Sequence, residues 1–345
     1  MSVVLQPEAR QLFSSYKADV ARANGVDSTK QTFAVLPVPT QKIIQAYQEA
    51  ADFLKLINVW PVDNAKGEKI SLSLGTTIAG NTNTNLNPRQ PTPVGALDLL
   101  DEYDCTQTNY DVAMKWILLN AWRHFPDFKK KLQEMVIRAV ALDKLCIGWN
   151  GVYRAATSDR VANPLLQDVK KGWLQKIREN APEQHYEGVD VTVGGVTSKK
   201  TLIGSAHEFK TLDGLIEFGI EEYIAEQHRD SGLIAICGRG ILSDKYLPLL
   251  NTIQDPTEQL AARTIYANKQ LGTLKALHVP KFPAKTILIT TPDNLSIYIQ
   301  NGTFNRSIVD QPEWDRAVDF QSINEDYVVE DYTKCLLIEN IELDD

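Results

Sequence analysis

The feature that most constrains the fold is a polar stretch of the chain between residues 60 and 112. Residues 67–75 alternate apolar and polar side chains, as a strand with one buried face does. Residues 76–93 are then rich in Thr, Asn, Gly, Gln and Pro, and an extended segment returns through residues 97–109. A two-stranded ribbon is marginal alone in water, and so long a loop is usually functional or bound to a partner. We therefore expect a ribbon with a polar tip, covered by another copy of the same chain.

Outside this ribbon, helical periodicity is strongest over residues 126–147. Along that helix we expect Met135, Val136 and Ala139 to be buried. Further helices are predicted at residues 7–23, from Thr40 as N-cap to about 57, at 165–178, at 212–227 with Thr211 as N-cap, and from Gly240 to about 250.

Strand signals are concentrated in the second half of the chain. A Gly-Gly turn at residues 194–195 between alternating residues predicts a hairpin. Further strands are expected at 233–237, 274–279, 285–290, 295–300, around Ile308, at 318–320 and at 336–343. Helices and strands that do not alternate as βαβ units indicate the α+β class.

Charge is unevenly distributed along the chain. The net charge is −8, but residues 310–345 alone carry twelve acidic and two basic side chains. We interpret this segment as a solvated acidic face; a surface that repels DNA or attracts a basic partner is the alternative. A protein that grips nucleic acid would carry a strong basic patch, and the totals give no support for one.

Motifs for chemistry are absent from the sequence. The four cysteines stand singly and no histidine has zinc-ligand spacing from them, so no metal, cofactor or catalytic site is predicted. The Gly238–Gly240 segment lacks the third glycine and the Lys-Ser/Thr of phosphate-binding motifs and is expected to be a tight strand-to-helix turn. No run of about 18 apolar residues occurs, so no membrane partner is expected. An enzyme whose site gathers distant residues, for instance around Gly238 and His278, stays open as an alternative.

Several short segments, in a fixed order over nearly the whole chain, carry a family resemblance. They are Gly67-Glu-Lys-Ile-Ser, Trp149-Asn-Gly-Val, Thr157-Ser-Asp-Arg, Asn163-Pro-Leu-Leu-Gln-Asp-Val, Gly172-Trp-Leu-Gln, Ser243-Asp-Lys-Tyr-Leu-Pro, Asn294-Leu-Ser-Ile-Tyr and Asn324-Glu-Asp-Tyr-Val-Val-Glu-Asp-Tyr332. Together they resemble the major capsid proteins of tailed double-stranded DNA phages of the P-two (peduovirus) type.

The resemblance implies the Hong Kong 97 capsid fold. It assigns residues 1–33 to an N-terminal assembly segment, 34–64 to the N-arm, 65–112 to the extended loop, 113–204 to the peripheral domain with its spine helix at 126–147, 205–310 to the axial domain, and 311–345 to strands that return to the peripheral domain.

The function implied is structural and not enzymatic. Subunits would assemble through hexamers and pentamers into an icosahedral head, in the host cytoplasm, with a scaffolding protein, a prohead protease and a portal as partners and double-stranded DNA packaged without sequence specificity. The loop residues expected to contact a neighbouring subunit are Gly75, Gly80, Asn81, Asn83 and Pro93. An encapsulin-like compartment, which shares the fold and encloses an enzyme, is the alternative.

The resemblance also implies that the N-terminal segment faces the interior and is removed during maturation. Because the segment after residue 24 is polar, we expect it to be exposed and flexible enough to enter a protease. The cleavage window then comprises Ser28, Thr29, Lys30, Gln31, Thr32, Phe33, Ala34 and Val35. The alternative is that helix 7–23 docks permanently on its own subunit.

Overall fold

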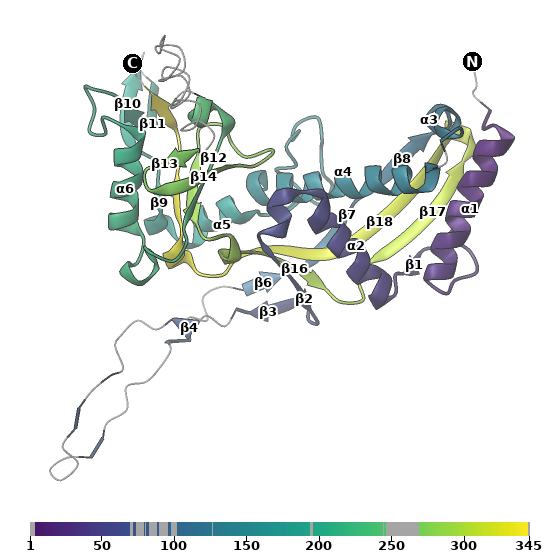
Figure 1. The fold of residues 1–345 in the computed structure, drawn as a ribbon, viewed down its shortest axis with the longest axis horizontal. Coiled ribbons are helices and arrows are strands. Elements are labelled where there is room, and N and C mark those ends of the chain that lie inside the picture. The colour runs from purple at the N-terminus through teal and green to yellow at the C-terminus, as the bar shows by residue number, and fades with distance from the viewer. Residues whose placement is uncertain are drawn as a thin grey trace, which may run out of the picture.

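The protein has an elongated body from which a narrow ribbon projects (Figure 1). The computed structural model describes residues 4–69, 72–73, 79, 81–82, 88–89, 96–97, 102–125, 127–193, 196–243, 245 and 269–343. A long sheet and the N-terminal helix occupy one end of the body, and smaller sheets occupy the other (Figure 1). The mixture of helices and strands confirms the predicted α+β class.

The long sheet is organised around one strand, β18 (Arg316–Val329). Its order is β1-β17-β18-β16-β2, and β7 and β8 also pair with β18. The pairs that β18 makes with β7, β8, β16 and β17 are all antiparallel. The partners are β1 (Phe33–Ala34), β2 (Asn58–Val62), β7 (Thr106–Asn109), β8 (Val112–Lys115), β16 (Leu295–Gln300) and β17 (Asn305–Gln311).

The spine helix α4 (Phe128–Asn150) lies along this sheet, joined by α2 (Pro37–Ala50) and α5 (Trp173–Asn180) (Figure 1). The rings of Trp149 and Trp173 lie 4.8 Å apart, and Trp173 meets Tyr327 of β18 at 5.2 Å. Gly148 makes this packing possible, because a Cβ there would lie 2.2 Å from the Trp173 ring. An aromatic cluster therefore ties two helices to the central strand.

The predicted core positions of α4 are partly right. Val136 is buried as expected, but Met135 is only half-buried and Ala139 is exposed. Val140 and Ala141 are buried instead and belong to the core cluster that contains the apolar residues of α2 and the long sheet. The prediction for Ala139 is wrong because the buried face of a helix depends on what packs against it, and the periodicity of the sequence does not show that.

Several helix boundaries also differ from the predictions, and α2 ends at Ala50 instead of near residue 57. Helix α2 begins at Pro37, with proline in its first turn, instead of being capped by Thr40. The Thr40 hydroxyl donates to the Leu36 carbonyl oxygen at 2.9 Å, so it sits inside the first turn. The helix expected from residue 165 begins only at Trp173, after a segment with Leu166 at a positive φ of 60°.

The other end of the body is built on a six-stranded sheet of order β13-β14-β12-β15-β19-β9. Helix α6 (Leu212–Tyr223), capped by Thr211 as predicted, buries Leu215 and Ile216 in the core cluster of this end. The strands are β9 (His185–Tyr186), β12 (Ile234–Cys237), β13 (Gln270–Leu271), β14 (Leu274–His278), β15 (Ile287–Thr290) and β19 (Leu336–Ile338). Beside it lies the sheet β10 (Val189–Val193), β11 (Val196–Ile203) and β20 (Ile341–Leu343), which contains the expected hairpin.

Strand pairing crosses the residue ranges that the family resemblance assigns to domains. Strand β16 lies within 205–310 and β17 begins there, and both pair in the long sheet. Strand β19 falls within the expected return segment 311–345, yet it pairs with β15 and β9 at the opposite end. The chain thus crosses between the two ends more than once.

The N-terminal helix α1 (Pro7–Ala23) is part of the subunit's core. It buries Ala9, Phe13 and Tyr16 in a cluster with apolar residues of α3 (Trp116–Trp122), of α4 and of the long sheet. Docking of helix 7–23 on its own subunit was the alternative left open by the sequence, and it is the arrangement observed. Short 3-10 helices occur at Asp52–Lys55, Pro182–Gln184, Glu226–His228, Pro292–Asn294, Pro312–Trp314 and Tyr332–Lys334.

Replacing Gly148 with alanine should destabilise the subunit by about 1–3 kcal/mol, because the added methyl group would collide with the buried Trp173 ring. The measurement is the free energy of unfolding in urea. Gly214→Ala is the matched control, since its Cβ would meet nothing closer than 3.4 Å and alanine favours a helix. Equal stability of the two variants would contradict the packing described.

Candidate functional site

The ribbon joins the body through two short strands, which we call the ribbon root. Strands β3 (Lys66–Glu68) and β6 (Glu102–Asp104) pair antiparallel, and β4 (Leu72–Ser73) pairs with β5 (Ala96–Leu97) farther out. The expected two-stranded excursion is therefore confirmed in its described parts (Figure 1). After Cys105 the chain enters β7, so the ribbon is continuous with the long sheet.

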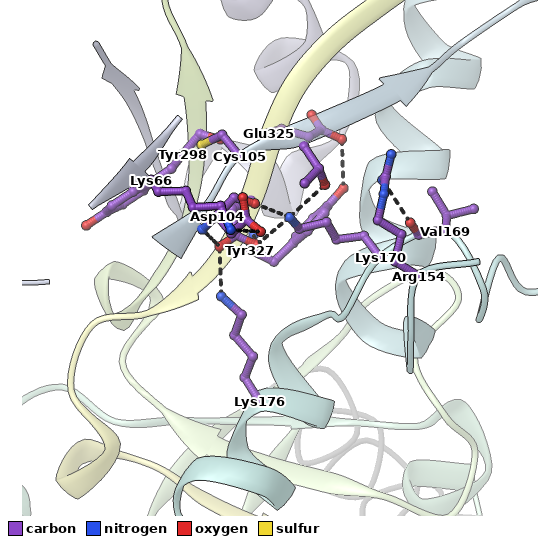
Figure 2. Close-up of polar contacts among 12 residues, drawn as sticks. Lys66, Asp104, Cys105, Arg154, Val169, Lys170, Lys176, Tyr298, Glu325 and Tyr327 are labelled. Atoms are coloured by element: carbon purple, nitrogen blue, oxygen red, sulfur yellow. Dashed lines mark hydrogen bonds and ion pairs between the residues drawn. The ribbon is translucent and has the colours of Figure 1, made fainter. Parts of the chain in front are cut away.

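Asp326 of β18 is the carboxylate at the ribbon root. Its Oδ2 accepts from the backbone N–H of Asp104 at 3.0 Å and from the Lys176 ammonium at 2.9 Å. The Lys170 ammonium lies 3.3 Å from Oδ1 and also donates to the backbone oxygen of Asp104. Lys170 and Lys176 approach the same point beside Asp104 from different segments (Figure 2). We call Asp326, Lys170 and Lys176 the ribbon-root clamp.

All three side chains of the ribbon-root clamp are buried. Burial lowers the pKa of Lys170, and the neighbouring Asp326 carboxylate opposes that shift. A buried ion pair costs desolvation that its attraction often does no more than offset. The clamp therefore adds little net stability while its geometry stays well defined.

The preceding residue, Glu325, forms a second buried ion pair. Its carboxylate accepts hydrogen bonds from the Lys144 ammonium of the spine helix and from the hydroxyls of Tyr110 and Tyr327. Glu325 is fully buried, and only 3% of the Lys144 side chain is exposed. Burial raises the pKa of both tyrosines, and the Glu325 carboxylate raises it further, so both phenols stay protonated and donate.

A third buried carboxylate, Asp319, is held by Arg306 of β17. The guanidinium donates to both carboxylate oxygens, at 3.0 and 2.7 Å, and also to the hydroxyl of Tyr16 in α1 at 2.8 Å. Asp319, Glu325 and Asp326 all lie in the segment that was expected to be a solvated acidic face. That expectation is wrong for these three residues, because cations from other parts of the chain neutralise them inside the protein.

The expected cleavage window is largely fixed to the sheet. Phe33 and Ala34 form β1 on β17, and Thr29 accepts from the backbone N–H of Ile308 at 2.7 Å. Thr29, Phe33 and Val35 are buried, whereas residues 30–32 are exposed. The expectation of an exposed window is therefore wrong for Thr29, Phe33 and Val35, because the segment pairs with the edge of the long sheet.

Of the five loop residues expected to contact a neighbour, only Asn81 is described, and it is exposed. Gly75, Gly80, Asn83 and Pro93 lie outside the described residues.

The turn at Gly238, named in the alternative catalytic site, packs against protein backbone. Gly238 follows β12, and Cys237 pairs with His278 in register, so the two segments are neighbours. However, a Cβ at Gly238 would lie 2.3 Å from the Ala284 carbonyl oxygen, which closes the turn against protein backbone. Within the described residues, no group of three or more His, Cys, Asp or Glu is placed to hold a metal ion. None of the helices among the described residues is long and apolar enough to cross a membrane.

Replacing Lys144 with methionine should destabilise the subunit by about 3–5 kcal/mol, because Glu325 would be left buried without its counter-charge. The double variant Lys144→Met/Glu325→Gln should recover most of this loss, since glutamine keeps an acceptor for Tyr110. Unfolding free energies of the four proteins in the cycle measure the coupling. Additive losses would contradict a coupled pair.

Comparison with known proteins agrees with this architecture. Residues 12–341 match the model of the phage major capsid protein P2 family. The chain is 39% identical to the capsid proteins of Escherichia phage P2, covering 99% of this chain and 96% of the relative. It is 33% identical to the major capsid protein of Serratia phage KSP20, covering 96% of each.

A solved structure extends the comparison to the fold. A chain of the satellite phage P4 procapsid that includes the size determination (Sid) protein superposes with a TM-score of 0.80 at 37% identity, covering 99% of both chains. The expected Hong Kong 97 fold is confirmed, and the capsid relatives favour the capsid over the encapsulin alternative. The chain belongs to the P2 family of phage major capsid proteins.

Proposed function

We propose that this subunit assembles through hexamers and pentamers into the icosahedral head that encloses a phage DNA genome. As a member of the family, the chain is a structural component of a phage capsid. The observation that carries the proposal is the ribbon, whose described strands leave the body and lack a core of their own (Figure 1). Two such strands need a partner surface to be stable, and a neighbouring copy supplies one in a closed shell.

The contact between copies would be heterologous, with the ribbon of one subunit on the body of the next. Contacts of this kind close into rings when the rotation between copies fits. The elongated body suits a ring whose centre is formed by the end that carries α6, while the ribbon reaches sideways. Asn81, with the other four predicted loop residues, is proposed to lie in this contact.

The remaining partners follow from the same proposal. A scaffolding protein would direct assembly in the host cytoplasm, a prohead protease would process the particle, and a portal would admit the DNA. The net charge of −8 fits a shell that encloses DNA without gripping its sequence. The proposed role is structural and involves no catalytic step.

Deletion of residues 78–93 should abolish closed shells or make them fragile while leaving the subunit folded. The reason is that this stretch is rich in Thr, Asn, Gly, Gln and Pro and has few large apolar side chains to contribute to a core. Sedimentation and negative-stain microscopy of protein co-expressed with its scaffolding protein measure assembly, and circular dichroism measures folding. A variant that forms intact shells would refute the ribbon contact, and one that unfolds would place the segment in the subunit's own core.

Cleavage between Ser28 and Val35 stays a prediction. Because β1 pairs with β17, a protease would reach the exposed residues 30–32 only if the flanking contacts loosen. Intact-mass analysis of subunits from mature, DNA-filled particles should give a new N-terminus in this window. A full-length mass would instead make α1 a permanent part of the shell subunit.

A further inference from the structure

The ribbon root is held by side chains where a sheet would normally supply a backbone partner. Strand β18 pairs with β7 from Ser322 opposite Asn109 to Glu325 opposite Thr106. At Asp104, the backbone N–H donates to the Asp326 carboxylate, and the backbone oxygen accepts from the Lys170 ammonium. One ion pair thus satisfies both backbone groups of the residue at which the ribbon leaves the body.

The two strands of the ribbon root are also held together by contacts with each other. The Asp104 carboxylate lies 3.1 Å from the Lys66 ammonium on the opposite strand, and Cys105 donates its backbone N–H to Ala65 at 2.7 Å. The Tyr103 ring covers Gly67 so closely that a Cβ there would lie 2.6 Å from the Tyr103 hydroxyl oxygen. A change in the ribbon's direction must therefore occur at the junction with the body and not within these strands.

We propose that Asp326, held by Lys170 and Lys176, is the positioning residue that sets the direction in which the ribbon leaves the subunit. The inference rests on the proposed function in one respect, that the ribbon must reach a neighbouring copy. Its physical basis is a difference between two kinds of contact. Backbone hydrogen bonds between β7 and β18 fix the direction of β7 in the sheet. At Asp104 the hydrogen bonds come from side chains instead, so the positions of those side chains determine where the ribbon points.

The two lysines that hold Asp326 are themselves fixed to the body at helix α5. Lys176 lies one turn after Trp173, whose ring is fully buried and whose indole N–H donates to the Ser296 carbonyl oxygen at 3.0 Å. Lys170 precedes the helix and also donates to the hydroxyl of Thr106, the first residue of β7, at 2.9 Å. The two lysines therefore tie Asp326 and the ribbon root to the aromatic core of the body.

A buried ion pair is a weak source of net stability, so the clamp calls for another role. The lowered pKa of Lys170 means that burial disfavours its charged form, so the ammonium is kept at a cost. Without Asp326, two buried ammonium groups would face each other and the Asp104 N–H would lose its acceptor. Asp326→Asn tests the charge alone, because the amide oxygen can still accept that hydrogen bond.

The direction of the ribbon can be measured in unassembled, full-length subunits. Spin labels on Glu68→Cys in the ribbon and Glu183→Cys on the body report one distance by pulsed electron paramagnetic resonance; both sites are exposed, whereas the four native cysteines are buried. We expect a narrow distance distribution in the doubly labelled parent and a broadened or shifted one after Asp326→Asn. Lys176→Met, which leaves the Lys170–Asp326 pair, should broaden it less.

Glu339→Gln is the matched control, because it removes the carboxylate that Arg178 of the same helix holds at 2.7 Å, away from the ribbon. It should leave the distance distribution unchanged. If Asp326→Asn unfolds the subunit, Lys176→Met alone decides the question. A distribution like the parent's in every folded clamp variant would overturn the positioning role. Shells that form after deletion of residues 78–93 would refute the ribbon contact but leave this distance result standing.

Discussion

The structure depends on the neutralisation of three carboxylates inside one long strand. Asp319, Glu325 and Asp326 lie on β18, and each takes its counter-charge from a different region: β17, the spine helix, or the segment around α5. Any of these carboxylates left unpaired in the interior would cost several kcal/mol. Strand β18, at the centre of the long sheet, therefore also determines the positions of the N-terminal helix, the spine helix and the ribbon.

This dependence explains what could be predicted from the sequence and what could not. Helices 7–23 and 212–227, the hairpin and the two-stranded excursion follow from local spacing and turn residues, and each is found, although the second helix ends at Tyr223. The length of β18 was missed because Glu325 and Asp326 interrupt its apolar pattern, and only their distant lysines make burial tolerable. For the same reason, an acidic segment was interpreted as a solvated face. Local patterns carry no information about partners more than a hundred residues away.

The position of the N-terminal segment also could not be predicted from the local sequence pattern. The polarity of residues 24–32 suggests a hinge, yet Thr29 and β1 complete the edge of the long sheet. An edge strand offers unpaired backbone groups, and its own chain covers it here. The segment that follows α1 thus protects an edge that would otherwise be open to wrong pairing.

We propose that the ribbon, braced at its root and clamped to the body, contacts a second copy of the subunit. Cryo-electron microscopy of particles formed with the scaffolding protein tests this most directly. The account predicts closed shells in which the ribbon of each subunit lies across the body of its neighbour. Shells in which every ribbon folds back on its own subunit would contradict it.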